Sequence, residues 1–528
     1  MKVLISDRMD PGCVDLLQRF PGISVEVRTD LTHAGLLEAI GDYEGLIVRS
    51  GTEVTEEVIG AGKRLRVIGR AGAGVDNIDV AAATRRGIVV MNTPGGNSTS
   101  TAEHCFGLIL ALARRIPGAS ASVRAGGWER SSFTGVELAG KTLGIIGLGK
   151  VGREVAHRAG AFQMRVLGHD PYVSAEAALS HGAQLVPLEQ LWAESDFISV
   201  HLHLTDQTRH YISREQIASC KDGVRIINCA RGGIVDEAAL LGALNSGKVA
   251  GAALDVLERE PPGEEDALVR HEAVICTPHI GASTEEAQAS VALQVAEQVG
   301  ETLSDPDMPV RNAVNLPSVE PEVYRALQPY LDLAERMGRI QAQLGTGQLE
   351  RITVEYHGEV TNHPTSPITA AVLKGLMETI SNEIVNYVNA PIFAQERGLS
   401  VDELKSSEPE DFASMITVVY HAGSERVLSG TIFGKSDPRI VRLDDYHFDA
   451  VPEGNMLFYT NEDIPGVIGR VGTIMGSHGV NIAQMSCGRQ QVGGRALTIL
   501  NVDSPIPDGV LDELLASDDV KWATRVGL

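Results

Sequence analysis

Residues 143–170, LGIIGLGKVGREVAHRAGAFQMRVLGHD, decide the fold of this 528-residue chain. The apolar run Leu143–Ile146 predicts a buried strand, a glycine pattern follows it directly, and the next stretch has the periodicity of a helix. Gly147 permits a tight turn, Gly149 lets backbone N–H groups approach a pyrophosphate, and Gly152 lets the helix lie close to the sheet. The pattern therefore predicts a dinucleotide-binding strand, turn and helix.

The end of the same stretch indicates which dinucleotide binds. A second strand-like run, Arg165–Leu167, is followed by Asp170, which stands 18 residues after the last glycine of the pattern. A carboxylate in this place accepts hydrogen bonds from a ribose diol and repels a 2′-phosphate. We therefore expect NAD rather than NADP.

Outward from this stretch, short β-branched runs alternate with helix-like segments at about one strand per 25 residues, as parallel βαβ units require. The first series comprises Val3–Ser6, Ser24–Val27, Leu46–Val48, Arg66–Ile68 and Ile88–Val90. The second comprises Leu143–Ile146, Arg165–Leu167, Phe197–Val200, Arg225–Asn228, Gly251–Leu254 and Ala273–Cys276. The pattern predicts α/β architecture with two doubly wound parallel sheets.

Two longer helices are expected to cross between the two sheets. One is Ser100–Arg115, with a capping box formed by Ser100 and Glu103, and the other begins at Ser283 and runs to about Leu303. The strand-like segment Val310–Leu316 is expected to return to the first sheet.

Beyond Pro317 the pattern changes to an α+β region followed by a strand–helix–strand–strand–helix–strand order of ferredoxin type. The α+β region is expected to hold helices Val323–Leu344 and Ile368–Val388 and strands Ile352–His357, Ser414–His421 and Arg426–Ile432. The tail is expected to hold Met456–Thr460, Gly466–Gly476, Ile482–Ser486, Arg495–Val502, Gly509–Ala516 and Val520–Arg525.

Composition excludes several classes of function. The formal net charge is −24, and an acidic surface repels nucleic acids and anionic membranes. The apolar run 105–113 is far shorter than the ~20 residues of a membrane span, so no membrane partner and a cytoplasmic location are expected. The six cysteines contain no C-x-x-C pair, which favours buried thiols, and we expect no metal site.

Three chemically versatile side chains follow consecutive strands of the second series. Arg231 lies in NCARGG, Glu260 in LDVLEREPP and His279 in CTPHIGAST. The carboxyl ends of strands in a doubly wound sheet line one crevice, so these side chains are expected to converge. An arginine can bind a carboxylate and polarise a carbonyl, while a histidine oriented by a carboxylate can exchange a hydroxyl proton. The set is typical of a dehydrogenase.

These motifs, with RAGAGVDNID and NTPGGNSTSTAEH, resemble those of the D-isomer-specific 2-hydroxyacid dehydrogenase family. The resemblance spans the whole chain and is closest to a long form of that family. It implies a flavodoxin-like substrate domain, a Rossmann NAD domain, an intervening domain of the allosteric substrate-binding type and a ferredoxin-like ACT domain. The expected ranges are 1–98 with 283–316, then 99–282, 317–452 and 453–528.

The resemblance implies NAD-dependent oxidation of D-3-phosphoglycerate to 3-phosphohydroxypyruvate, the first step of L-serine biosynthesis. It implies that His279 is the acid/base, Glu260 its partner and Arg231 the ligand of the substrate carboxylate and carbonyl. The implied cofactor contacts are Gly147, Gly149, Lys150, Val151, Gly152, Asp170, Cys229, Ala230, Asp255, Gly281 and Ala282. The implied substrate contacts are Arg49, Ser50, Gly72, Gly74, Asn97 and Arg231, with Arg70 as a further contributor.

The tail motif NEDIPGVIG, with Asn461 and Asp463, and the later Asn481 resemble the effector loop of ACT domains. The resemblance implies L-serine as effector, with Asn481 supplied by a neighbouring chain of a homo-oligomer, a tetramer. Pairing of edge strands without an effector is the alternative. A basic cluster at 435–447 fits either a second anion site or a solvated face.

Two other functions remain open at this point. A hydroxypyruvate or glyoxylate reductase would not need Arg49, and an NAD-sensing regulatory protein would keep the same residues without turnover. The chain also departs from the family in three places. After His201, Leu202-His203 stands where a Thr-Pro is usual, Lys150 stands where an arginine is common, and Asn461 stands where relatives often have a bulkier histidine or tyrosine.

Overall fold

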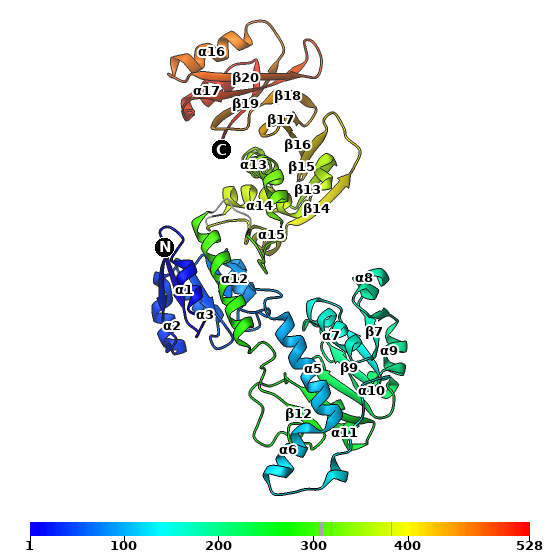
Figure 1. The fold of residues 1–528 in the computed structure, drawn as a ribbon. Coiled ribbons are helices and arrows are strands. Elements are labelled where there is room, and N and C mark those ends of the chain that lie inside the picture. The colour runs from blue at the N-terminus through cyan, green and yellow to red at the C-terminus, as the bar shows by residue number, and fades with distance from the viewer. Residues whose placement is uncertain (306–309, 318, 382) are drawn as a thin grey trace.

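The computed structural model describes residues 1–305, 310–317, 319–381 and 383–528. Four sheets follow one another along this part of the chain (Figure 1). The first two lie beside each other in the lower half of the view, and the third and fourth are stacked above the first.

The first sheet has five parallel strands in the order β2-β1-β3-β4-β5, which confirms the flavodoxin-like expectation. Its strands are β1 (Lys2–Ile5), β2 (Ser24–Val27), β3 (Gly45–Val48), β4 (Val67–Arg70) and β5 (Val89–Met91). Its helices are α1 (Gly12–Leu17), α2 (His33–Ala39), α3 (Glu56–Ala61) and α4 (Val80–Arg85), with the 3-10 turn η1 (Ile40–Asp42).

The second sheet has seven parallel strands in the order β12-β11-β10-β9-β6-β7-β8, the strand order of a Rossmann domain with one strand added. Its strands are β6 (Thr142–Ile146), β7 (Arg165–His169), β8 (Gln184–Leu185), β9 (Phe197–Val200), β10 (Val224–Asn228), β11 (Val249–Leu254) and β12 (Val274–Cys276). Its helices are α7 (Lys150–Ala161), α8 (Ala175–Ser180), α9 (Leu188–Glu194), α10 (Arg214–Ser219) and α11 (Glu237–Asn245). The expected doubly wound sheet is confirmed.

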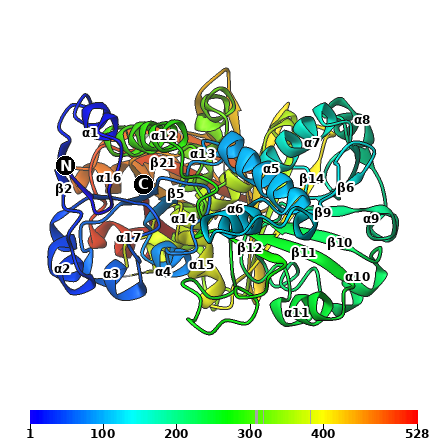
Figure 2. The same ribbon diagram turned by 60° about the horizontal axis from the view of Figure 1, so that its bottom comes forward.

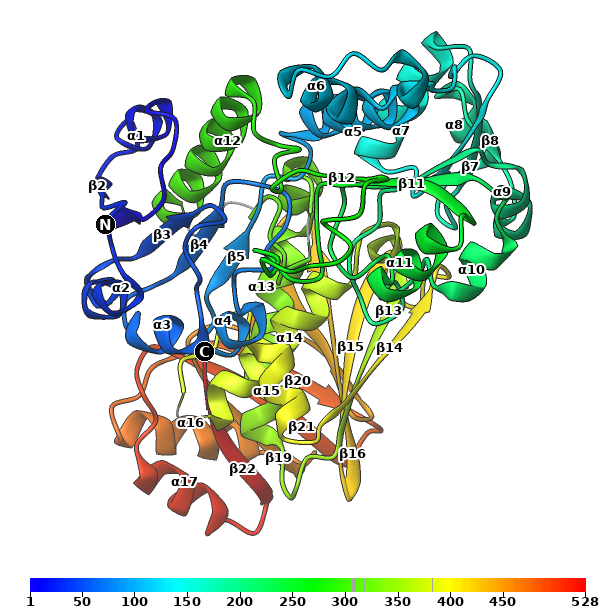
Figure 3. The ribbon, with the colours of Figure 1, turned by 90° about the horizontal axis from the view of Figure 1, so that it is seen from below.

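Two helices link the sheets, α5 (Ser98–Arg114) and α12 (Glu285–Ser304) (Figures 2 and 3). The apolar face of α5 joins the core of the second sheet, whereas α12 packs against β4 and α1 of the first. The expected capping box at Ser100 was wrong, because α5 begins two residues earlier. The Ser100 hydroxyl instead hydrogen-bonds to that of Thr284, 2.7 Å away, which caps α12.

A short second helix, α6 (Ile116–Arg124), and a 3-10 turn, η2 (Arg130–Phe133), continue from α5 as an arm away from both sheets. No residue of α6 is buried. Among the described residues no single helix is long and apolar enough to cross a membrane, although the bent pair α5 and α6 together meets the criteria of length and composition.

The segment Val310–Leu316 was expected to return to the first sheet as a strand. It returns by one antiparallel bridge, Met91 to Ala313. Asn315 completes the contact, because its side chain accepts from Val90 N at 2.9 Å and donates to the Ile88 carbonyl at 2.9 Å. Two backbone hydrogen bonds, Asn92 N to the Asn312 carbonyl and Val314 N to the Val90 carbonyl, and the Asn315 side chain thus hold the segment in place of a longer ladder.

The third sheet is mixed, in the order β14-β13-β15-β16-β17-β18. Its strands are β13 (Arg351–Gly358), β14 (Ser400–Ser406), β15 (Ser414–Ala422), β16 (Ser424–Phe433), β17 (Asp437–Leu443) and β18 (Tyr446–Ala450). Its helices are α13 (Pro321–Leu344), α14 (Ser366–Ile380) and α15 (Ala390–Glu396), with the 3-10 turn η3 (Glu359–Asn362). The sequence did not predict β14, β17 or β18, and α14 ends eight residues before the expected Val388.

The fourth sheet is antiparallel in the order β20-β21-β19-β22, which confirms the ferredoxin-type tail. Its strands are β19 (Asn455–Glu462), β20 (Ile482–Arg489), β21 (Arg495–Val502) and β22 (Val520–Gly527), and its helices are α16 (Val467–Ser477) and α17 (Asp508–Leu515).

Candidate active site

Two adjoining cavities lie between the first two sheets. The first, of about 350 Å³, contains the glycine turn and the strand ends of the second sheet. The second, of about 420 Å³, contains the strand ends of the first sheet. Both cavities are lined by Arg231, His279, Asn97 and Ala282, which therefore lie where the two cavities meet.

The glycine turn has the geometry that the sequence predicted. Gly147 has φ +92°, a conformation that side chains disfavour, and a Cβ on Gly152 would lie 2.0 Å from the Gly147 carbonyl oxygen. A Cβ on Gly149 would meet no other atom within 4 Å. The backbone at the N-terminus of α7 is thus open toward the cavity, and these residues fit a pyrophosphate.

Asp170 lies beside this turn, where it organises the backbone. Its Oδ2 accepts a hydrogen bond from Leu148 N at 2.8 Å, and its Oδ1 accepts from Tyr172 N at 2.9 Å. The carboxylate is therefore fixed at the end of β7, in the place expected of a ribose-binding acid.

Most of the expected cofactor residues line the first cavity. They are Gly149, Lys150, Val151, Gly152, Cys229, Ala230, Asp255, Gly281 and Ala282, whereas Gly147 and Asp170 lie outside its lining. Lys150 bridges to the first sheet, since its Nζ donates to the Pro94 carbonyl at 2.9 Å. The departing residues His201, Leu202 and His203 also line this cavity.

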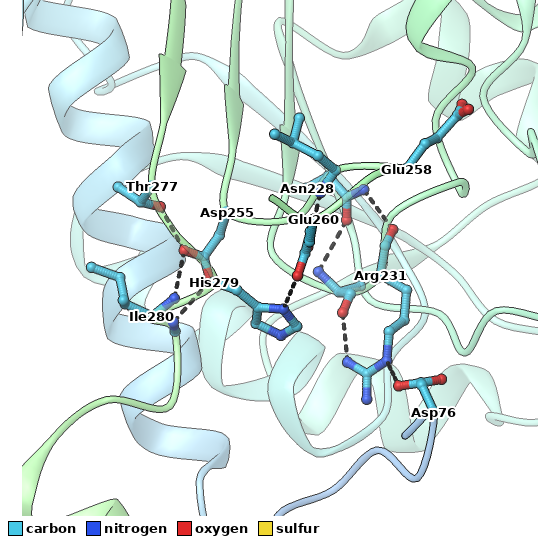
Figure 4. A network of polar contacts seen from close by, with 12 residues as sticks. Asp76, Asn228, Arg231, Asp255, Glu258, Glu260, Thr277, His279 and Ile280 are labelled. Atoms are coloured by element: carbon cyan, nitrogen blue, oxygen red, sulfur yellow. Dashed lines mark hydrogen bonds and ion pairs between the residues drawn. The ribbon is translucent and has the colours of Figure 1, made fainter. Parts of the chain in front are cut away.

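His279 and Glu260 form a pair at the junction of the cavities (Figure 4). His279 Nδ1 lies 2.8 Å from Glu260 Oε2, and both side chains are partly exposed. Glu260 Oε1 accepts from Leu257 N at 3.0 Å. Burial alone would raise the pKa of the Glu260 carboxyl, but the hydrogen bonds from His279 and the Leu257 amide outweigh it and lower that pKa. Glu260 is therefore ionised at neutral pH and orients the imidazole.

The loop that carries His279 is held by Asp255, a carboxylate that is 2% exposed at the end of β11. Asp255 Oδ1 accepts from Ile280 N at 2.9 Å and from Thr277 Oγ1 at 2.5 Å, and its Oδ2 accepts from Gly281 N at 2.8 Å (Figure 4). These bonds hold His279 at a left-handed φ of +52°.

Arg231 crosses between the two sheets. Its Nε donates to Asp76 Oδ2 of the first sheet's loops at 2.8 Å, and its Nη1 donates to the Ala230 carbonyl at 2.7 Å. Asn228 shapes the Arg231 loop, because it donates to the Arg231 carbonyl and accepts from Ala230 N. One edge of the guanidinium is thus anchored near His279.

The second cavity contains the other expected substrate residues, Arg49, Ser50, Gly72, Gly74 and Asn97, together with Arg70. Burial, followed by the positive charge of Arg231, lowers the pKa of the Arg70 guanidinium to about 10. Its buried Nε has no hydrogen-bond partner among the described residues. Three arginines therefore face one cavity, an arrangement suited to an anion.

The expected effector residues do not converge within one chain. Asp463 precedes α16 and pairs with Arg489 at 3.2 Å, whereas Asn481 follows α16 and donates to Asp503 Oδ2 at 2.6 Å. The eleven residues of α16 separate them by about 16 Å. Asn461 is buried and donates to the Glu462 carbonyl at 2.7 Å.

The basic cluster lies on the hairpin of β17 and β18 and is partly neutralised by its own surroundings. Arg439 pairs with Asp437 and, at 3.0 Å, with Asp449, and Arg442 donates to the Asp444 carbonyl at 2.8 Å. Within the described ranges no group of three His, Cys, Asp or Glu side chains is arranged to hold a metal ion.

Sequence reasoning missed two residues of this site. Asp76 pairs with Arg231, and His104 of α5 contacts Asp255. Both lie within motifs quoted for the family resemblance, yet their partners are 155 and 151 positions away in the chain. A single sequence contains no signal that joins such distant positions.

The chain matches three described families in succession. Residues 106–281 match the NAD binding domain of the D-isomer specific 2-hydroxyacid dehydrogenases. Residues 326–444 match the D-3-phosphoglycerate dehydrogenase intervening domain, and residues 455–518 match the ACT domain.

Individual relatives match the chain over its full length. It is 46% identical to the D-3-phosphoglycerate dehydrogenase of Archaeoglobus fulgidus, over 100% of both chains. It is 44% identical to that of Synechocystis sp., over 100% of this chain and 95% of the relative. The solved structure of D-lactate dehydrogenase from Aquifex aeolicus, complexed with NAD and lactic acid, is 30% identical with a TM-score of 0.53. It covers 60% of this chain and 100% of its own.

Proposed function

The chain belongs to the D-3-phosphoglycerate dehydrogenase family, whose members are NAD-dependent 2-hydroxyacid dehydrogenases of serine biosynthesis, and from this membership we propose roles for its residues. The alternatives of a hydroxypyruvate or glyoxylate reductase and of an NAD-sensing binding protein are thereby set aside. We propose four domains at the expected ranges, 1–98 with 283–316, 99–282, 317–452 and 453–528.

His279 is proposed as the acid/base. The residues around Gly149 and Gly281 would hold NAD in the first cavity, where it would supply the hydride acceptor for the carbinol carbon of the substrate. No described residue bonds to Nε2 of His279, which leaves this nitrogen to take the hydroxyl proton. Glu260 bonds to Nδ1 and stabilises the imidazolium that forms. The 2.8 Å contact between these two side chains, at the junction of the cavities, is the observation that carries the proposal.

Arg231 is proposed to bind the substrate carboxylate and to polarise the carbonyl that forms. Its position between the two sheets places it beside both His279 and the second cavity. The phosphate is proposed to bind in the second cavity, where Arg49, Ser50, Asn97 and the backbone of Gly72 and Gly74 form the walls. A chain of net charge −24 needs such local positive groups to hold a dianion.

The phosphate role can be tested by comparing 3-phosphohydroxypyruvate with unphosphorylated hydroxypyruvate as NADH-linked substrates. We expect the wild type to prefer the phosphorylated substrate by at least about 100-fold in kcat/KM. Arg49→Gln should reduce this preference by roughly tenfold or more, because it removes a charge-assisted partner of the phosphate. The exposed Arg19, which follows α1, provides the control Arg19→Gln. An unchanged preference in Arg49→Gln would exclude the phosphate role of Arg49.

We also propose that L-serine binds to the fourth domain at an interface between two copies of the chain. Asn461 and Asp463 of one copy would be completed by Asn481 of the other, since one chain holds Asp463 and Asn481 at opposite ends of α16. Gly466, with φ +100°, stands directly before α16, whose first backbone N–H groups are suited to a carboxylate.

The arm of α6 and η2 supports a homo-oligomer, proposed to be a tetramer. It exposes Ile116, Val123 and Trp128, the last by 73%. An apolar arm that its own chain leaves uncovered is suited to packing against a second copy. The unpaired cysteines and the acidic surface are consistent with the proposed cytoplasmic location.

Titration with L-serine separates sensing from assembly. We expect L-serine to inhibit the wild type and Asp463→Ala to raise the half-inhibitory concentration by about tenfold or more, because the ammonium loses its carboxylate. Asp512→Ala, in the exposed face of α17, is the matched control. Particle mass should be measured in the same samples. Full activity at saturating L-serine would restrict the fourth domain to assembly.

A further inference from the structure

A third contact of the buried Asp255 carboxylate comes from the helix that links the two sheets. His104 of α5 places its Nε2 3.2 Å from Asp255 Oδ1 and 3.0 Å from Thr277 Oγ1. His104 does not line either cavity of the active site, so it lies behind the residues that face the cofactor and substrate.

The direction of these hydrogen bonds follows from the number of hydrogens available. The Thr277 hydroxyl has one hydrogen, which it donates to Asp255 Oδ1 at 2.5 Å. An ionised carboxylate has none. The hydrogen between His104 and these two oxygens must therefore be carried by Nε2 of His104.

The pKa shifts of His104 and Asp255 agree with a hydrogen bond donated by His104. The hydrogen bond to Asp255 raises the pKa of the His104 imidazole. Burial alone would raise the pKa of the Asp255 carboxyl, but the hydrogen bonds from His104, Thr277 and the two loop amides outweigh it, so that pKa is lowered. Asp255 is therefore ionised, and His104 is a hydrogen-bond donor to it.

We propose that His104 is a positioning residue of the dehydrogenase reaction, which holds the loop of His279 by donating its Nε2 hydrogen to Asp255 and Thr277. This inference rests on the proposed acid/base role of His279. The Asp255 carboxylate accepts from the amides of the two residues that follow His279, and the Asp255 carbonyl accepts from His279 N at 2.9 Å. A shift of the carboxylate would therefore move the imidazole that must meet the substrate.

The same contact influences the charge near the acid/base. Asp255 is close enough to Glu260 for its negative charge to raise the pKa of that carboxyl, which opposes the net lowering. The thiol of Cys105, next to His104, lies 3.2 Å from Ser199 Oγ, while Glu103 is paired with Arg158 of α7. Among these three consecutive residues of α5, His104 is therefore the one that contacts Asp255.

Two substitutions separate the hydrogen bond from the charge. His104→Leu removes both, and we expect kcat to fall by roughly 10- to 100-fold because a buried carboxylate loses a partner. His104→Gln keeps an N–H donor without the charge, and it should restore most of kcat. In both variants the acidic limb of the pH profile of kcat should move to higher pH, because neither leucine nor glutamine can carry a positive charge beside Asp255.

Glu103→Gln is the matched control, since it changes the charge of the adjacent residue without contact to Asp255, and it should behave as the wild type. If His104→Leu does not fold, Thr277→Val removes the bridging hydroxyl and should lower kcat in the same way. A kcat for His104→Leu within twofold of the wild type, or a pH profile unmoved in both His104 variants, would overturn the proposal. Full activity in His279→Asn would instead remove the proposed function on which it rests.

Discussion

Replacing His279 by asparagine is expected to lower kcat by about 10³- to 10⁴-fold, because the general base at the reacting hydroxyl is lost. Asparagine is the informative replacement because the residue has φ +52°, and asparagine tolerates the left-handed region better than alanine. The loss then reports the missing imidazole rather than a distorted loop. Steady-state oxidation of D-3-phosphoglycerate measures the effect.

Binding of NADH to the same variant, followed by fluorescence, should remain within about threefold of the wild type, because the glycine turn does not contact His279. His157→Asn, on the exposed face of α7, controls for the loss of a histidine elsewhere in the domain. Turnover within tenfold of the wild type would exclude His279 as the acid/base.

Replacing Arg231 by alanine is expected to lower kcat/KM by about 10²- to 10³-fold, the range for removal of one donor that stabilises developing charge. Arg231→Lys should recover only part of this loss, because an ammonium lacks the planar pair of donors that matches a carboxylate. The measurement is kcat and KM for 3-phosphohydroxypyruvate with NADH.

Arg231 also bonds to Asp76, so the thermal midpoint of each variant should be measured beside the rates. This bond is partly exposed and contributes little stability, so the expected shift is small. Arg270→Ala, which breaks an exposed ion pair with Glu265, gives a comparable change of charge away from the cavities. Equal kcat/KM values for Arg231→Ala and Arg270→Ala would contradict the proposed role of Arg231 in binding the substrate carboxylate.

The sequence predicted the parts of the site that depend on local pattern. Gly147 is required by its positive φ, and Gly152 is required because a Cβ there would lie too close to the Gly147 carbonyl. Both glycines lie within a stretch of six residues. The convergence of Arg231, Glu260 and His279 followed from the general rule for strand ends in doubly wound sheets. Their placement in one cleft is therefore predictable without a structure.

The remaining contacts depend on packing between distant segments. The pair Arg231–Asp76 joins two domains, and the His104–Asp255 contact joins a linking helix to a strand end. The strand β14, SVDELKS, was missed because it is exposed over most of its length and lacks an apolar alternation. Pairing with β13 determines its structure, and its own residues indicate it only weakly.

The position of α12 has a consequence for synthesis of the protein. The core of the first sheet includes Val291, Val295 and Val299 of this helix, which leave the ribosome at least 200 residues after the end of β5. At ~5–20 residues per second, the nascent first domain waits roughly 10 to 40 s for the helix that covers it. During that time the whole second domain emerges and can fold, so the domain begun first is completed second. Chaperone contact during translation would therefore fall on the uncovered face of β4.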